Sequence, residues 1–129
     1  MEERIVAADP VGDPQSYQRE LLALLGGRDP VAVLAATPRA VRERAGSLSH
    51  ALLGRRPDPT EWSVAELLDA FTALRTANLA LIRDTPEALW DRLGIHAERG
   101  PISFRLMTET MAGHDCAHLR QLQQTIVAV

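Results

Sequence analysis

The longest uninterrupted hydrophobic pattern in the chain covers residues 63–84, which contain neither glycine nor proline. Its apolar residues alternate at spacings of three and four, and the pattern is interrupted only at Asn78. The stripe consists of Val64, Leu67, Phe71, Leu74 and Leu81, widened by Leu68 and Ile82. Such spacing gathers apolar side chains on one side of a helix. The segment therefore predicts one long amphipathic helix that starts near Ser63.

A second apolar stripe near the C-terminal end predicts the last helix over residues 102–126. At about 100° per residue, its apolar face is formed by Phe104, Met107, Met111, Leu122 and Ile126. His114 and His118 fall inside this stripe. We therefore expect both imidazoles to face the core or a cleft rather than bulk water.

Four of the pairs in which a proline directly follows a capping residue each predict a helix start. These four pairs are Asp13-Pro14, Asp29-Pro30, Thr37-Pro38 and Thr85-Pro86. Helix ends are predicted at Gly26-Gly27, at Gly54 with Pro57, and at Gly94. No segment has the pattern of a strand, and residues 96–101 are expected to form a polar turn.

These elements predict an all-helical protein of one domain, since 129 residues are one domain's length. Aromatic residues make up only 4% of the chain, so the core must consist mainly of Leu, Val, Ile and Ala. Leu and Ala are strong helix formers, which supports the same fold class. Residues 1–12 are expected to form an extended N-terminal arm, and residues 13–129 the helical domain.

Charge and cysteine content exclude several classes of partner. The formal net charge is -3, and the basic residues form no concentrated stripe, so we expect neither nucleic acid nor an anionic membrane as partner. Cys116 is the single cysteine and has no partner for an internal disulfide. The first residues lack the pattern of a signal peptide, and no segment is apolar enough to span a membrane. The expected location is the cytoplasm.

The most informative chemical feature is the pair His114 and His118. Two residues four apart on a helix have Cβ atoms roughly 5–6 Å apart, a spacing at which two imidazoles can bind one divalent cation. In the alternative interpretation, they bond to each other, to water or to Asp115. A catalytic zinc site typically needs a third protein ligand. His50 and His96 are the candidates, although each is also explained as a solvated or capping histidine.

Three blocks of sequence together resemble the DinB/YfiT-like family, specifically its DinB_2-type members. They are residues 29–44 (DPVAVLAATPRAVRER), residues 61–67 (EWSVAEL), and residues 96–101 (HAERGP) followed by Gly113-His114-Asp115 and His118. The resemblance implies a four-helix bundle with up-down-down-up topology. It also implies a divalent metal, zinc or nickel, held by three histidines, of which two match His114 and His118. A low-molecular-weight thiol substrate is implied as well.

The chain departs from the family pattern at the third histidine, whose position falls at Ala70. The crossover between the second and third bundle helices also has no counterpart, so residues 64–82 are expected to form one fused helix. The expected fold is a shortened DinB-like bundle with three long helices plus short N-terminal and connecting helices. Its uncovered apolar side favours a homodimer.

The resemblance to the DinB/YfiT-like family and the absence of its third histidine together suggest two functions. The first is a metal-dependent transferase or hydrolase of the DinB/YfiT type, with His114 and His118 as metal ligands. The second is a non-catalytic helical module for dimerisation or interaction that has lost its metal site. The histidine pair favours the first, and Ala70 favours the second.

Overall fold

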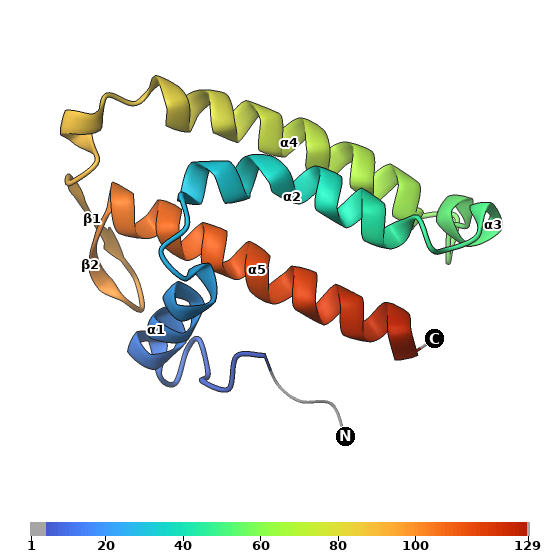
Figure 1. The fold of residues 1–129 in the computed structure, drawn as a ribbon, viewed down its shortest axis with the longest axis horizontal. Helices are drawn as coiled ribbons and strands as arrows, with labels where there is room; N and C mark the ends of the chain where they lie inside the picture. Colours follow the sequence, from blue (N-terminus) through green and yellow to red (C-terminus); the bar gives the residue numbers. More distant parts are fainter. Residues whose placement is uncertain (1–4, 129) are drawn as a thin grey trace.

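The computed structural model describes residues 5–128, and within them the chain is predominantly helical (Figure 1). The elements in chain order are α1 (Pro14–Leu25), α2 (Pro30–Ala45), α3 (His50–Gly54), α4 (Val64–Asp84), the 3₁₀ turn η1 (Glu87–Leu89), β1 (Leu93–His96), β2 (Gly100–Ser103) and α5 (Phe104–Ala128). The predicted helical fold class is confirmed, and α2, α4 and α5 are the three long helices.

Helix α2 lies between α4 and α5 and contacts both of them, while α1 packs against α5 (Figure 1). Helices α2 and α5 run in the same direction, and α4 runs in the opposite direction. The arrangement is therefore an up-down-up set of long helices, with the short α1 covering one side of α5. Among the described residues, no single helix is long and apolar enough to cross a membrane. Only α1 and α2 counted together, bent by 79° where they meet, reach that length and composition.

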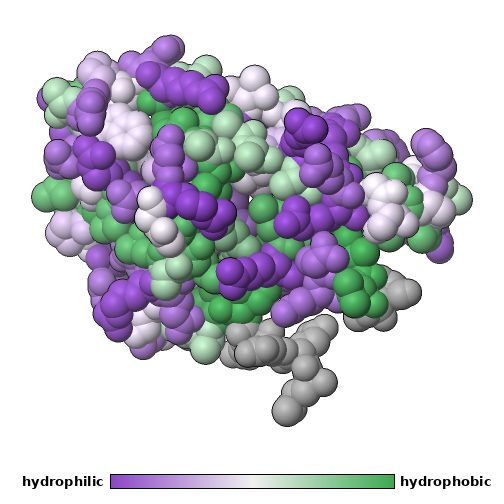
Figure 2. All heavy atoms as spheres, in the orientation of Figure 1, coloured by the Kyte–Doolittle hydropathy of each residue, from purple (hydrophilic) through white to green (hydrophobic). Residues whose placement is uncertain are grey.

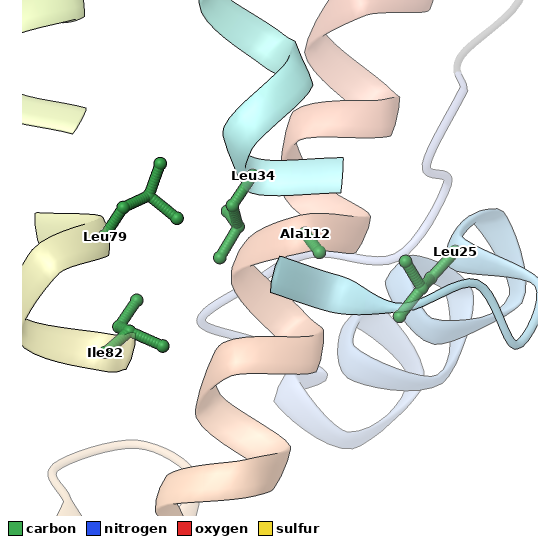
Figure 3. Close-up of a cluster of buried hydrophobic side chains, with 5 residues drawn as sticks. All are labelled: Leu25, Leu34, Leu79, Ile82 and Ala112. Atoms are coloured by element: carbon green, nitrogen blue, oxygen red, sulfur yellow. The ribbon is translucent and has the colours of Figure 1, made fainter. Parts of the chain in front are cut away.

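The core is built from small aliphatic side chains contributed by every helix except α3. Figure 3 shows its centre, which consists of Leu25, Leu34, Leu79, Ile82 and Ala112. Trp90 and Phe104 pack edge to face beside it, with ring centroids 5.2 Å apart. This composition agrees with the low aromatic content of the chain.

Most of the predicted helix starts are confirmed by their caps. Asp13 accepts from the amide of Ser16, and Asp29 accepts from the amide of Val31. Ser63 begins α4 with a capping box, in which Ser63 and Glu66 each accept from the other's amide. The Arg56 guanidinium, together with the amide of Ser63, lowers the pKa of Glu66 to about 2.

The predicted helix start at Thr37-Pro38 is wrong, because Pro38 lies inside α2. A proline within a helix has no amide hydrogen to donate to the carbonyl four residues earlier. That carbonyl belongs to Leu34, and it accepts from Nη1 of Arg75 on α4 at 3.0 Å. A donor from another helix therefore replaces the missing backbone bond and lets α2 continue.

The helix predicted to end at Gly54 and Pro57 is two helices. Helix α2 ends at Ala45, and a separate short α3 begins at His50 after the cap Ser49. Thr85-Pro86 leads only to the three-residue turn η1. Thr85 does not cap this turn, because its hydroxyl donates to the Leu81 carbonyl oxygen instead.

The expectation that no strand occurs is also wrong, since β1 and β2 form an antiparallel hairpin. The pairing runs from Leu93 opposite Ser103 to His96 opposite Gly100. Gly100 has a φ of +72°, the left-handed conformation that closes a three-residue hairpin loop. The expected polar turn is therefore the tip of this hairpin, and Gly94 lies within β1 rather than ending a helix.

The apolar stripe predicted for α4 is divided between two faces of the helix. Arg75, Leu79 and Ile82 are the buried residues of α4. By contrast, Leu67, Leu74 and Leu81 are 53%, 66% and 73% exposed. The predicted helix is confirmed, but half of its apolar stripe faces away from the rest of the chain.

The N-terminal segment contacts α1 through a carboxylate. Of the arm predicted over residues 1–12, residues 1–4 lie outside the described part. Residues 5–12 form neither helix nor strand. Oε2 of Glu20 accepts from the amides of Ala7 and Ala8, at 2.7 and 3.3 Å. Oδ1 of Asp9 accepts from the amides of the turn that leads into α1.

Candidate functional site

The two histidines of α5 lie against each other one helical turn apart. Their Nε2 atoms are 3.1 Å apart, and their rings meet edge to face with centroids 4.2 Å apart. Nδ1 of His118 lies 3.1 Å from Oε1 of Gln121 and donates to this acceptor. That bond leaves the lone pair of His118 on Nε2, directed at His114. The pair is therefore a hydrogen-bonded unit even when no other group is present.

The pair separates two hollows, and both rings line both of them. One hollow, of about 510 Å³, is bordered by the N-terminal segment and by Tyr17 of α1. The other is a groove of about 670 Å³ between α2, α4 and α5, lined mostly by apolar side chains such as Phe71 and Leu122. Both histidines are exposed, so the expectation that their imidazoles face away from bulk water is wrong, although both rings line the two hollows. A small molecule or ion can therefore approach the imidazoles from two sides.

The pKa of His114 lies below its ordinary value, so the imidazole is neutral near neutral pH. Loss of hydration is the main cause that lowers the pKa of His114, and the neighbouring His118 lowers it further. Asp115 acts in the opposite direction, whereas Arg75 adds to the decrease. A neutral imidazole has a lone pair available to a metal ion, whereas a protonated one does not.

A buried ion pair lies directly beside the histidines. Asp115 accepts two hydrogen bonds from Arg75, with Oδ1 3.0 Å from Nη2. Oγ1 of Thr37 lies 2.6 Å from Oδ2 of the same carboxylate. Both charged side chains are about nine-tenths buried. This network joins α2, α4 and α5, and it sets the orientation of the turn of α5 that carries His114.

Close packing of α1 also fixes the position of this turn. Gly113 is buried directly before His114, and a Cβ atom there would come within 2.2 Å of the Leu21 carbonyl oxygen. Only glycine lets the backbone of α1 lie against α5 at this distance. The packing of α1 therefore helps to fix the position of the histidine pair on α5.

The two candidate third ligands are used elsewhere. His96 caps the tip of the hairpin, where its Nδ1 accepts from the amides of Glu98 and Arg99. His50 is exposed at the start of α3. Ala70 does not line the groove, which α4 borders through Val64, Leu67, Leu68, Phe71 and Arg75. Within residues 5–128, no group of three or more His, Cys, Asp or Glu side chains is arranged to hold a metal ion.

The donor set fits a metal ion in part. With zinc–nitrogen bonds of 2.0–2.1 Å, two ligand nitrogens on one ion lie about 2.9 Å apart at a right angle and about 3.3 Å apart at the tetrahedral angle. The 3.1 Å between the Nε2 atoms falls between these values. The pair thus fits two positions of one coordination sphere, but the described residues do not form the three-histidine centre that the family resemblance implies.

Sequence reasoning missed Arg75 and Thr37 as neighbours of the candidate site. A signal was present for Arg75, because it occupies the same helical face as Leu79 and Ile82, where a lone cation requires a partner. Thr37 carried no such signal, since its pairing with Pro38 had a sufficient explanation as a cap.

Comparison with known proteins gives one informative result. Residues 63–122 match the model of the DinB superfamily, a span that runs from the cap of α4 into α5 and includes both histidines. Neither a search of curated proteins nor a search of solved structures gives a significant match. The family match agrees with the helical fold described above. Together they support the assignment of this chain as a DinB-like helical protein.

Proposed function

We propose that this protein binds a divalent transition-metal ion through Nε2 of His114 and Nε2 of His118. The observation that carries the proposal is the convergence of these two nitrogens at 3.1 Å. Gln121 supports it by fixing the tautomer of His118, in the way that an outer hydrogen bond commonly orients a metal-bound imidazole. The lowered pKa of His114 keeps its imidazole neutral at neutral pH, so metal binding requires only that its proton move from Nε2 to Nδ1.

Two protein ligands leave several coordination positions open. A bound divalent ion acts as a Lewis acid and lowers the pKa of water or another ligand at such positions. The resemblance to thiol-dependent S-transferases favours a low-molecular-weight thiol as that ligand, with zinc or nickel as the metal. The apolar groove provides space beside the histidines for the rest of such a molecule.

Metal analysis of the untagged protein tests this proposal. After dialysis against zinc or nickel and removal of free ions, we expect one ion per chain by elemental analysis. His114→Ala and His118→Ala should each lose that ion while keeping the far-ultraviolet circular dichroism of the parent. His50→Ala is the matched control, because His50 is exposed on α3, and it should retain the metal. Absence of metal from the parent protein, or its retention in both site variants, would reject the proposal.

The second candidate function is a non-catalytic helical module, and two observations favour it. The position that corresponds to the family's third histidine is Ala70, and it lies outside the groove lining. The histidine pair is also satisfied by its own hydrogen bonds, so it needs no ion to explain its presence. A protein without metal that still self-associates would support this second function over the first.

A further inference from the structure

The outward face of α4 carries a regular pattern of large and small apolar residues. Leu67, Ala70, Leu74, Ala77 and Leu81 alternate at spacings of three and four. At about 100° per residue they fall within about 80° of arc, turned about 130° from the buried residues Arg75, Leu79 and Ile82. We call these five residues the leucine–alanine stripe.

Four of the five residues of this stripe are exposed in the described chain, and only Ala70 is partly buried. Its three leucines are 53%, 66% and 73% exposed. Helix α4 packs mainly against α2 and α3, and it forms one edge of the fold (Figure 1). On the face shown in Figure 2, hydrophobic atoms reach the surface between polar side chains. Apolar residues repeated along one helix at the surface mark a contact with another helix rather than with water.

We propose that the leucine–alanine stripe is a homodimer interface in which α4 packs antiparallel against α4 of a second copy. The spacing of three and four is the one at which two helices interlock along a seam. An antiparallel register places Leu74 beside the partner's Ala77 and Leu81 beside the partner's Ala70. Leu74 and Leu81 then each fill the space above an alanine, so the two helices can approach closely, whereas Leu67 falls at the end of the seam opposite Asp84. The stripe is thus complementary to itself, as a twofold interface requires.

The distribution of charge also favours a second copy of the chain as the partner, with the two α4 helices antiparallel. The leucine–alanine stripe contains no charged residue, because Asp69 and Arg75 lie on other faces of α4. In the antiparallel register, Asp84 lies near the start of the partner's α4, where the helix dipole favours a negative charge. Glu66 at that end is already paired with Arg56. A parallel pairing would instead bring the two Asp84 carboxylates together.

The size of the stripe predicts how strong the dimer is. A helix of 21 residues is about 31 Å long and about 10 Å wide. One such face supplies less than the ~800 Å² per partner found in typical stable complexes. Leu67 also borders the apolar groove beside α4, which extends the uncovered surface. We therefore expect a dimer that dissociates on dilution rather than an obligate one.

Sedimentation velocity over a range of concentrations tests the interface. The parent chain should pass from monomer to dimer as concentration rises. Leu74→Glu should raise the dissociation constant at least tenfold with unchanged circular dichroism. Thr76→Glu, which puts the same charge on the opposite exposed face of α4, should leave it within twofold. A parent chain that stays monomeric up to about 1 mM, or a Leu74→Glu variant that dimerises like the parent, would overturn the proposal.

Disulfide trapping tests whether the two α4 helices are antiparallel. This experiment remains decisive if Leu74→Glu fails to fold. In a Cys116→Ser background, Ala70→Cys and Leu81→Cys chains should crosslink when mixed and oxidised, because these positions oppose each other in the antiparallel register. Neither chain should crosslink to itself, and self-crosslinking of both would overturn the antiparallel arrangement. The dimer does not depend on the metal proposal, since Leu74→Glu should bind metal like the parent.

Discussion

Nη1 of Arg75 donates to the carbonyl oxygen of Leu34 at 3.0 Å, the acceptor that Pro38 leaves without a partner inside α2. The same guanidinium is held by the carboxylate of Asp115 on α5 and lies over the ring of Phe71. One side chain therefore completes the backbone bonding of one helix while neutralising a buried charge on another. This explains why a cation occupies the core face of α4.

Removal of one member of the Arg75–Asp115 pair should be strongly destabilising. Arg75→Met leaves a buried carboxylate without a counter-charge, and breaking a buried pair in this way costs about 3–5 kcal/mol. We expect a loss of that size in the free energy of unfolding, measured by urea denaturation.

A double variant at Arg75 and Asp115 distinguishes the loss of the ion pair from the cost of leaving a buried carboxylate unpaired. Arg75→Met combined with Asp115→Leu removes both charges, and we expect it to recover part of the stability lost in the single variant. An equal or greater loss in the double variant would show that the pair itself, rather than the unpaired carboxylate, accounts for the effect.

Gly113→Ala should destabilise the protein although alanine is the better helix former. Alanine would gain about 1 kcal/mol over glycine inside a free helix. At position 113, however, its Cβ would overlap the Leu21 carbonyl at 2.2 Å. Overpacking of this kind costs about 1–3 kcal/mol, and here the obstacle is backbone. We expect a lower melting temperature and displaced α1 resonances in NMR spectra.

The matched control is Gly54→Ala, where no atom lies within 4 Å of the added Cβ. Gly54 ends α3 at a φ that other residues adopt. Its replacement should leave stability unchanged or slightly raised. If both variants behaved alike, the proposed contact between α1 and α5 would be wrong.

The metal-free protein should lose stability as pH falls below the ordinary histidine pKa of 6.5. Because burial lowers the pKa of His114 in the folded state, the unfolded chain binds its proton at higher pH. Between 6.5 and the lowered value the unfolded state therefore holds more protons, and the free energy of unfolding decreases with decreasing pH. Urea titrations across this range should show the decrease, and His114→Gln should reduce its slope. An unchanged slope in that variant would assign the effect to another group.

A third histidine should restore metal affinity at position 71 rather than at position 70. Helices α4 and α5 run in opposite directions (Figure 1). Because Arg75 meets Asp115, we infer that Phe71, one turn earlier on α4, lies at about the same level as His118, about one turn later on α5. Both of these residues line the groove, whereas Ala70 does not. We expect Phe71→His to tighten zinc binding, measured by calorimetry, and Ala70→His to leave it unchanged. Tighter binding by Ala70→His alone would show that the family's ligand position still faces the histidine pair.

The sequence predicted the helices that start with a local cap better than the features that depend on contacts between distant parts of the chain. The caps at Asp13, Asp29 and Ser63 are local interactions, so the helices that they start could be derived from neighbouring residues. The hairpin was missed because its strands are four residues each and their pairing depends on the turn at Gly100. Thr37-Pro38 was misread because the donor that lets α2 pass through Pro38 comes from a different helix.

The candidate site was predicted in the same uneven way. The spacing of His114 and His118 was sufficient to bring their rings together, because residues four apart on a helix always share a face. Their relation to Arg75 and Thr37 depends on how three helices pack, which no local pattern encodes. The stripe on α4 was recognised as apolar, but its division into a buried and an exposed face follows only from the packing against α2.

We expect Pro38 to make the folding of α2 depend on the docking of α4. A peptide containing only residues 30–45 would leave the Leu34 carbonyl to water and should form little helix in its central turns. The missing donor lies 41 residues further along the chain, so the middle of α2 can become fully ordered only after α4 has reached it. Protection of these amides from hydrogen exchange should therefore develop with the docking of the two helices rather than before it.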